Sequence, residues 1–391
     1  MIRIKSKMDC CGCSACVQVC PKECIDMRAD TEGFLYPKVD EDACVECGIC
    51  EKTCPVINPY KSLQIVPDSY VCRVYDEELR LQSSSGGIFT LLASYIIENG
   101  GVVFGAAFDN EWNVAHDWTD SMEGLSKFRG SKYVQSVIGN TFKKVKEFLI
   151  AGRLVLFTGT PCQITGLKHY LNREYENLYS IDIVCHSVPS PKIWKKYLLE
   201  VCNFNLSTIQ YVTFRNKDCG WREYGLKIVT GDLVVDGSNT QNTYMKGFLK
   251  DLYTRPSCSE CPARNYKSGS DIMLADSWGL NIYHPDWDDN KGMSLVLVKT
   301  TKGKYLKDLL FNNVFWEEVP YEEVEDRGLH APITLSSKPH ILRKYFFKRI
   351  EKERVTVLIE KCLKLGDIYY SFKRSIKKVI KALFRICFKY K

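Results

Sequence analysis

The stretch "CCGCSACVQVCP", residues 10–21, places five cysteines within eleven residues. Four of these cysteines and the final proline follow the spacing C-x2-C-x2-C-x3-C-P. The same spacing returns 34 residues later in "CVECGICEKTCP", residues 44–55. Three closely spaced thiolates can surround one cuboidal iron–sulfur cluster, while the fourth, turned by the proline, reaches the cluster of the other half. The repeat therefore predicts two [4Fe–4S] clusters.

This crossing pattern assigns four ligands to each cluster. We expect the first cluster on Cys10, Cys13, Cys16 and Cys54, and the second on Cys44, Cys47, Cys50 and Cys20. A pair of zinc sites is the alternative, but zinc sites usually show two separated C-x2-C pairs, so runs of three with a Cys-Pro favour iron–sulfur. Residues 1–58 resemble the bacterial two-cluster ferredoxins. Cys11 and Cys24 remain outside the pattern and are interpreted as small buried residues.

The composition is that of a folded protein that does not need disulfides. The chain has 391 residues, with 45% hydrophobic and 26% charged residues, which is ordinary for a globular protein. No apolar run reaches the length of a membrane span, and the first residues lack the apolar segment of a secretory signal. We therefore expect the protein in the reducing cytosol, where dense cysteine usually means metal.

The net charge of +7 is concentrated at the end of the chain. From Ile368 onward there are eight Lys or Arg residues and no acidic residue, so this segment carries +8 and the first 367 residues carry the difference, −1. A nearly neutral body argues against nucleic acid as the main partner.

The middle of the chain alternates helix and strand patterns. Residues 59–69 are predicted to be a linker, because prolines punctuate the segment from Pro55 to Pro67. A helix is expected over 88–98 and a buried strand over 102–108. The preceding "SSSGG" is either an anion-binding turn at the helix start or a set of serine caps. Two further strands end near Cys162 and Cys185, and Cys258 and Cys261 form a C-x2-C pair.

Taken in order, several motifs resemble the coenzyme F420 hydrogenase/dehydrogenase beta-subunit family, in the branch with a fused ferredoxin domain that occurs among polysaccharide-cluster proteins. The motifs are "SSSGGIF" (83–89), "FRGSKYVQS" (128–136), "TGTPCQITGL" (158–167), "DIVCHSVPSP" (182–191), "FRNKDCGW" (214–221), "CSEC" (258–261), "SDIMLADSWG" (270–279) and "GMSLVLVKT" (292–300).

The resemblance implies an α+β fold: a small N-terminal ferredoxin domain, then a larger mixed α/β domain that binds a flavin, and a C-terminal helical tail. The implied domain bounds are 1–58, 70–335 and 336–391. It implies FAD, and a third [4Fe–4S] cluster on Cys162, Cys185, Cys258 and Cys261, whose alternative is simple packing of Cys162 and Cys185. By similarity the flavin site comprises Ser85, Gly86, Gly87, Ser131, Lys132, Tyr133 and Thr160.

The implied function is an iron–sulfur flavoprotein oxidoreductase. Single electrons would pass between the clusters and FAD, and the flavin would reduce or oxidise a small substrate, with polysaccharide biosynthesis as the suggested context. The expected redox carrier is a ferredoxin or a deazaflavin. His186 is the first candidate for a proton donor and Lys132 the second, while a purely local hydrogen bond is the alternative role for His186.

Two other functions compete with this interpretation. One is an electron-transfer adaptor that has clusters but no substrate of its own. The other is a metal-stabilised module that binds membrane or nucleic acid through the basic tail. In the tail, apolar residues from Phe372 to Cys387 follow one helical stripe with lysines opposite. Such a helix either lies on an anionic membrane surface as a peripheral contact or packs on the body.

Overall fold

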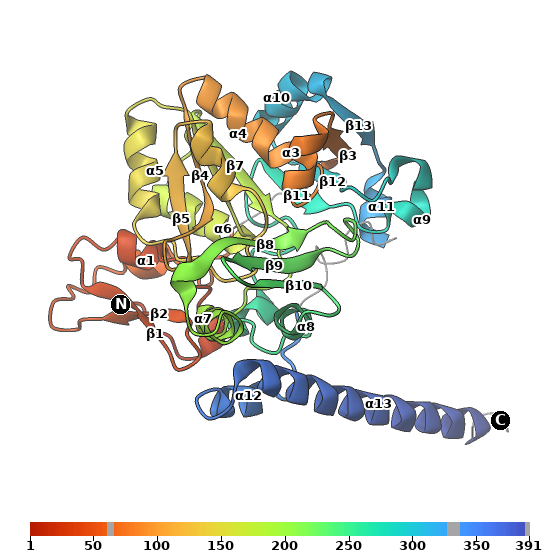
Figure 1. The fold of residues 1–391 in the computed structure, drawn as a ribbon. Coiled ribbons are helices and arrows are strands. Elements are labelled where there is room, and N and C mark those ends of the chain that lie inside the picture. Colours follow the sequence, from red (N-terminus) through yellow and green to blue (C-terminus); the bar gives the residue numbers. More distant parts are fainter. Residues whose placement is uncertain (61–65, 327–336, 388–391) are drawn as a thin grey trace.

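The computed structural model describes residues 1–60, 66–326 and 337–387. Its centre is a mixed sheet of eight strands in the described chain (Figure 1). In spatial order the strands are β13 (Val314–Glu318), β3 (Asp68–Val74), β12 (Ser294–Val298), β11 (Ile272–Asp276), β7 (Leu178–Ile183), β6 (Val155–Gly159), β4 (Val102–Phe108) and β5 (Val114–Thr119). The pairs β4/β6, β6/β7 and β7/β11 are parallel, so the carboxyl ends of these strands meet at one edge.

Helices cover both faces of this sheet because its strands alternate their apolar side chains between two cores. In β4, Val103 joins a core with α4 (Ile88–Glu98) and α10 (Thr301–Leu310). The neighbouring Phe104 joins the opposite core with α5 (Thr141–Ile150) and α6 (Pro161–Leu171). Burial on both faces explains why the strands are nearly continuous apolar runs. The short helix α3 (Glu77–Gln82) lies between β3 and α4 in the chain.

A second, three-stranded antiparallel sheet packs with helices beside the central sheet (Figure 1). It contains β8 (Ile209–Asn216), β9 (Gly225–Thr230) and β10 (Val234–Ser238). One apolar core joins this sheet to α7 (Pro191–Val201), α8 (Thr243–Leu249), α12 (Arg343–Arg349) and the first turns of α13 (Val355–Cys387).

The N-terminal domain is small and contains one hairpin and two short helices. Its elements are α1 (Ala15–Gln18), β1 (Ile25–Ala29), β2 (Leu35–Val39) and α2 (Ile49–Lys52). It packs on α6 so closely that a Cβ at Gly166 would lie 2.9 Å from Cys13 Cβ. The remaining short helices are α9 (Leu280–Tyr283), α11 (Tyr321–Asp326), η1 (Lys7–Asp9), η2 (Glu123–Phe128), η3 (Leu206–Thr208), η4 (Pro256–Glu260), η5 (Pro285–Trp287) and η6 (Phe311–Asn313).

The predicted fold class is confirmed: a small ferredoxin-like domain precedes a larger α/β domain and a C-terminal helix. The helix expected over 88–98 and the strand expected over 102–108 are α4 and β4. The domain bounds remain predictions. β3 begins at Asp68, inside the predicted linker, and residues 61–65 and 327–336 lie outside the described part. Within that part, no helix is both long and apolar enough to cross a membrane.

Candidate functional site

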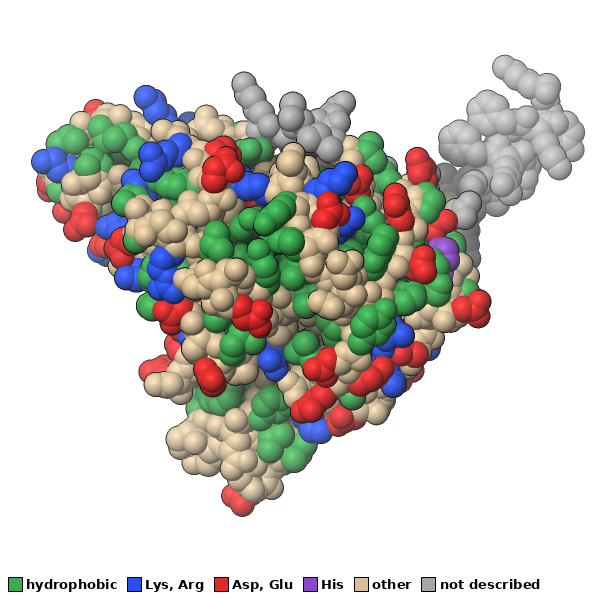
Figure 2. Space-filling model, turned by 90° about the horizontal axis from the view of Figure 1, so that it is seen from above, with side chains coloured by type: hydrophobic (Ala, Val, Ile, Leu, Met, Phe, Trp, Pro, Cys, Tyr) green, Lys and Arg blue, Asp and Glu red, His purple; other side chains and the backbone are tan. Residues whose placement is uncertain are grey.

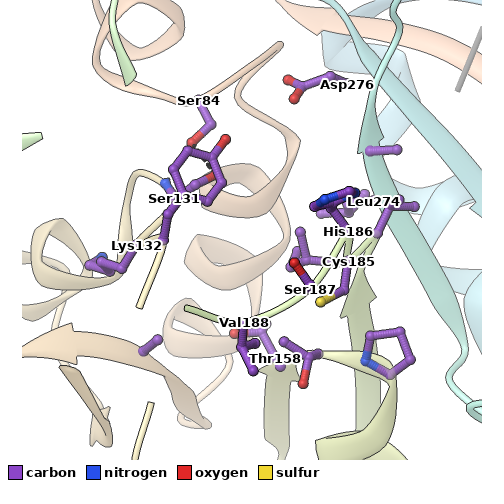
Figure 3. Close-up of a pocket in the computed structure, with 18 of the residues that line it drawn as sticks. Ser84, Ser131, Lys132, Thr158, Cys185, His186, Ser187, Val188, Leu274 and Asp276 are labelled. Atoms are coloured by element: carbon purple, nitrogen blue, oxygen red, sulfur yellow. Dashed lines mark hydrogen bonds between the residues drawn. The ribbon is translucent and has the colours of Figure 1, made fainter. Parts of the chain in front are cut away.

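A cavity of about 640 Å³ lies at the carboxyl ends of β6 and β7 (Figure 3). It is walled by the turn before α4, the loop 128–136, the β6–α6 turn, the segment 183–189 and the Cys258–Cys261 loop. Its volume falls in the range of cofactor and small-molecule pockets, about 300–1,000 Å³. Ligands of open α/β sheets bind at this kind of edge, beyond the carboxyl ends of the strands.

All four thiols predicted for a third cluster line this cavity: Cys162, Cys185, Cys258 and Cys261. Burial raises the pKa of Cys258 to about 12 and that of Cys261 to about 11, and the other thiols of the set add to both shifts. The pKa of Cys185 is raised by burial first, and then by the negative charges that the other three thiols would carry. The structure thus brings together cysteines that are up to 99 residues apart in the chain.

Backbone N–H groups point at two of these thiols. Cys258 accepts from the N–H of Val188, and Cys261 accepts from the N–H groups of Ala263 and Arg264. Hydrogen bonds of this kind stabilise sulfur anions and tune the potential of a bound cluster. The donor set, four half-buried thiols with backbone N–H donors at two of them, fits a [4Fe–4S] group.

In the N-terminal domain, thiols from the two halves of the repeat lie close to one another. Burial, followed by the charges of Cys10, Cys54 and Cys50, raises the pKa of Cys16, so thiols of the second half of the repeat, Cys54 among them, lie near those of the first. A second cavity, of about 20 Å³, is lined by the other predicted set, Cys20, Cys44, Cys47 and Cys50. The geometry supports the crossing assignment, whose ligands remain predictions. Cys11 and Cys24 are buried, as expected.

The described cysteines are free thiols. In the described segments no three His, Cys, Asp or Glu side chains converge on a point that would hold a single metal ion. The cysteines of a cuboidal cluster bind different iron atoms, so their sulfurs need not converge in that way.

The ferredoxin-like domain reaches the cavity through Cys11, and Arg255 of the body holds this domain in place. The Cys11 thiol is hydrogen-bonded to Cys162, and this contact raises the pKa of Cys162 together with burial. Arg255 is 1% exposed and donates from Nε to Cys10 O (2.8 Å), from Nη2 to Leu35 O (2.9 Å) and from Nη1 to Gln135 Oε1 (2.9 Å). Gln135 in turn donates to Cys11 O (2.9 Å).

The serine–glycine turn before α4 is not a set of serine caps. Gly87 occupies the N-cap with φ +89°, and no side chain accepts a hydrogen bond from the first helical turn. The serines bond elsewhere: Ser84 Oγ accepts from Ser131 N (2.7 Å), and Ser85 Oγ donates to Met293 O (2.5 Å). Gly87 and the first residues of α4 line the cavity, where helix N–H groups would favour an anion such as a cofactor phosphate.

Of the residues expected at a flavin site, all but Gly86 line the cavity. Ser85, Gly87, Ser131, Lys132, Tyr133 and Thr160 line the cavity. Gly86 instead faces the backbone behind the turn, where a Cβ would lie 2.3 Å from Cys72 O and 2.9 Å from Ser294 N. Its role is to let the turn pack against β3 and β12.

The two candidate proton donors lie in different surroundings. Lys132 Nζ donates to the carbonyls of Lys127 (2.8 Å), Arg129 (2.9 Å) and Gly130 (3.2 Å), and its side chain points away from His186 (Figure 3). Burial lowers the pKa of Lys132 to about 7, while three carbonyl acceptors favour its ammonium form. His186 lines the cavity next to Cys185, and its Nε2 lies 3.0 Å from Asp251 Oδ1.

Sequence reasoning missed His116, which lines the same cavity. Its Nε2 lies 3.0 Å from Thr158 O and can only donate there, so Nδ1 accepts from Ser136 Oγ (2.5 Å). Burial lowers the pKa of His116 to about 4, which keeps the ring neutral. A lone histidine in a strand gives no sequence signal, because its partners come from two other segments.

Sequence reasoning also missed an ion pair at the cavity wall. Arg215 donates to Asp276 through Nη1 (2.7 Å) and Nη2 (3.0 Å), and its guanidinium lies 4.2 Å from the ring centre of Tyr224. The bound carboxylate opposes the effect of burial and raises the pKa of Arg215. Asp276, Tyr224 and Trp278 line the cavity, which therefore has an aromatic wall with a fixed carboxylate.

Comparisons with known proteins agree with this architecture. Residues 9–58 match the model of the 4Fe-4S dicluster domain. Residues 152–323 match the model of the C-terminal part of the beta subunit of coenzyme F420 hydrogenase/dehydrogenase.

Three known proteins are similar to this chain. A coenzyme F420-dependent sulfite reductase of Methanocaldococcus jannaschii is 24% identical over 323 residues, which are 81% of this chain and 48% of that protein. A 7Fe ferredoxin of Hydrogenibacillus schlegelii is 39% identical over 57 residues, 15% of this chain and 65% of that one. A chain of the F420-reducing [NiFe] hydrogenase complex of Methanosarcina barkeri has 19% identity and a TM-score of 0.46, with 79% of this chain and 92% of that chain covered. The chain thus spans about half the length of the sulfite reductase.

The fold and the thiol pattern define an iron–sulfur protein with a 4Fe–4S dicluster domain at its N-terminus. More specifically, residues 152–323 match the C-terminal region of the coenzyme F420 hydrogenase/dehydrogenase beta-subunit family, which agrees with the resemblance seen in the sequence.

Proposed function

We propose that the protein is an iron–sulfur flavoprotein oxidoreductase. Single electrons pass between the two ferredoxin-type clusters and FAD, with a third [4Fe–4S] cluster on Cys162, Cys185, Cys258 and Cys261 between them. The flavin reduces or oxidises a small substrate. The observation that carries this proposal is the contact of Cys11 with Cys162, which joins the N-terminal thiol loop to the thiols of the cavity.

The residues of the cavity fit a flavin. The turn at Gly87 and the start of α4 would hold the phosphates, and Ser131 and Thr160 lie on the same wall. A bound flavin would exchange an electron pair with a substrate and single electrons with iron–sulfur clusters. Aromatic rings at Tyr133, Tyr224 and Trp278 would exclude water from the same space.

His186 is the proton donor of this proposal, because it lines the cavity and Asp251 orients its ring. Lys132 is the second candidate, although three carbonyls hold its ammonium group. A ferredoxin or a deazaflavin is the proposed carrier, in line with the names of the family and of the sulfite reductase. The polysaccharide context and the cytosolic location rest on the sequence resemblance and the sequence pattern alone.

The test is anaerobic purification of the full chain, followed by iron, sulfide and flavin analysis. About twelve iron atoms and one flavin per chain are expected. The double variant Cys258→Ser/Cys261→Ser should retain about eight iron atoms. Cys219→Ser is the matched control, because Cys219 is an exposed thiol outside both thiol regions, and it should retain all twelve.

Two outcomes would contradict the proposal. A preparation with eight iron atoms and no flavin would support an electron-transfer adaptor without its own substrate. A colourless, zinc-containing preparation would remove the iron–sulfur assignment itself.

A further inference from the structure

The C-terminal helix α13 consists of two parts with different surroundings. Its first turns are held by the body: Val355, Leu358, Ile359 and Cys362 are buried in the core with α7 and α8. Glu200 of α7 accepts hydrogen bonds from the N–H of Val355 and from the N–H of Thr356 (3.1 Å), which fixes the start of the helix. The direction of α13 is therefore set by the body.

The rest of α13 leaves the body (Figure 1). The last described contacts with the body are those of Asp367 with Lys250 (3.7 Å) and of Tyr370 with Ile341 N (3.4 Å) and with the ring of His340 (5.9 Å between ring centres). From Asp367 to Lys377 every side chain is exposed, whichever side of the helix it occupies. Most helical stability in proteins comes from the packing of an amphipathic face, so a second surface would stabilise the projecting part.

An apolar stripe runs along this projecting part. Ile368, Phe372 and Ile376 follow i, i+4 and i+8, and 59%, 66% and 43% of their surfaces are exposed. Leu365 and Tyr369 extend the stripe on the same side. In the sequence the spacing continues at Val379, Ile380 and Leu383, within the helix bounds. Such a stripe is typical of a helix that lies on another surface.

The charges of the same segment indicate the nature of that surface. From Ile368 to the end the chain has eight Lys or Arg residues and no acidic residue, whereas the first 367 residues together carry −1. On the face of the body seen in Figure 2, acidic and basic side chains are intermixed. Basic side chains beside an apolar stripe match an anionic phospholipid surface, in which the stripe enters the acyl region and the lysines contact headgroups.

We propose that the projecting part of α13 binds the surface of an anionic phospholipid membrane and holds the protein there as a peripheral protein. The apolar stripe supplies burial, and the basic residues select anionic headgroups. This proposal does not depend on the clusters or on a flavin, because it rests on the helix alone.

The test is flotation of the full chain with vesicles of phosphatidylglycerol and phosphatidylcholine, compared with vesicles of phosphatidylcholine alone. We expect binding to the mixed vesicles that is at least about tenfold stronger than to the neutral ones and that weakens as salt is raised from about 0.1 M to about 1 M. Lys373→Glu/Arg374→Glu/Lys377→Glu should weaken it at least about tenfold. The variant Phe372→Ser/Ile376→Ser should also lose binding, because the stripe no longer enters the acyl region.

The matched control is Lys5→Glu/Lys22→Glu/Lys38→Glu, which changes the net charge equally at three exposed lysines of the N-terminal domain. It should bind like the unchanged protein. Equal binding by both triple variants would overturn the proposal, as would absence of vesicle binding. Dimerisation that Phe372→Ser/Ile376→Ser abolishes, without vesicle binding, would assign the stripe to a second copy. Salt-sensitive DNA binding without vesicle binding would assign the charges to nucleic acid. Either result would also overturn the proposal.

Discussion

Arg255 should set both the anchoring of the N-terminal domain and the potential of the clusters beside it. Its buried guanidinium donates to Cys10 O, Leu35 O and Gln135 Oε1, and lies 4.4 Å from the ring centre of Tyr36. Burial raises the pKa of Cys10 and Cys258, and the contact with Cys11 and burial raise that of Cys162; the charge of Arg255 opposes the rise at all three thiols. One positive charge therefore acts on thiols of two predicted clusters.

Two substitutions separate the charge from the hydrogen bonds. Arg255→Lys keeps the positive charge, but a lysine ammonium group cannot reach all three acceptors as the planar guanidinium does. Arg255→Gln loses these hydrogen bonds and the charge as well. Each buried acceptor left without a donor costs about 1–3 kcal/mol. Both variants should therefore be destabilised by roughly 3 kcal/mol, which a denaturant or thermal unfolding series under anaerobic conditions measures.

The reduction potentials should respond mainly to the charge. A positive charge favours the reduced, more negative cluster, so its loss lowers the potential. An interaction of about 1–2 kcal/mol across a partly screened interior corresponds to on the order of 50–100 mV for a one-electron couple. Redox titration monitored by electron paramagnetic resonance should show this decrease in Arg255→Gln and little change in Arg255→Lys. Equal shifts in both variants, or none in Arg255→Gln, would refute the reasoning.

Three further outcomes follow from single contacts. Gly166→Ala should lose the first cluster in iron analysis, because the added Cβ would lie 3.0 Å from Cys13 Sγ, whereas Gly231→Ala, with open space around it, should retain all iron. The pKa of His116 is about 4 in the folded protein and about 6.5 in the unfolded chain, so the free energy of unfolding decreases as the pH falls from 6.5 toward 4, by about 2 kcal/mol at pH 5. The variant His116→Asn should therefore show a smaller decrease in melting temperature between pH 7 and pH 5 than the unchanged protein. Asp276→Asn leaves the buried Arg215 without its carboxylate and should cost about 3–5 kcal/mol in unfolding experiments, while Lys291→Gln, which breaks an exposed pair with Glu77, should cost about 1 kcal/mol or less.

Local patterns in the sequence predicted the elements that carry the thiols. The helix and strand around Gly100 were predicted to the residue, because glycine ends the helix and the following run is apolar. The strand, turn and helix around Cys162 also follow from a local pattern, and they are β6 and α6. Each of these predictions needed only neighbours in the chain.

The contacts between distant segments could not be predicted in this way. His116 finds its partners at Ser136 and Thr158, and Arg215 finds its carboxylate 61 residues away at Asp276. A single buried histidine or arginine looks in the sequence like any surface residue, because only the folded environment makes it neutral or pairs it. The serine turn shows the same limit: its serines bond to Ser131 and Met293 and not to their own helix.

The position of the N-terminal domain is itself a consequence of such distant contacts. The chain links this domain to the body near residue 60, yet the body holds it through Gln135 and Arg255. The backbone N–H groups of these two residues donate to Pro189 and Val188, in the segment that follows Cys185. Two of the residues that hold the ferredoxin-like domain are thus attached to the loop that carries the cavity thiols. A displacement of this domain would move Arg255 away from Cys162 and Cys258 as well, so docking and the electrostatic surroundings of the thiols change together.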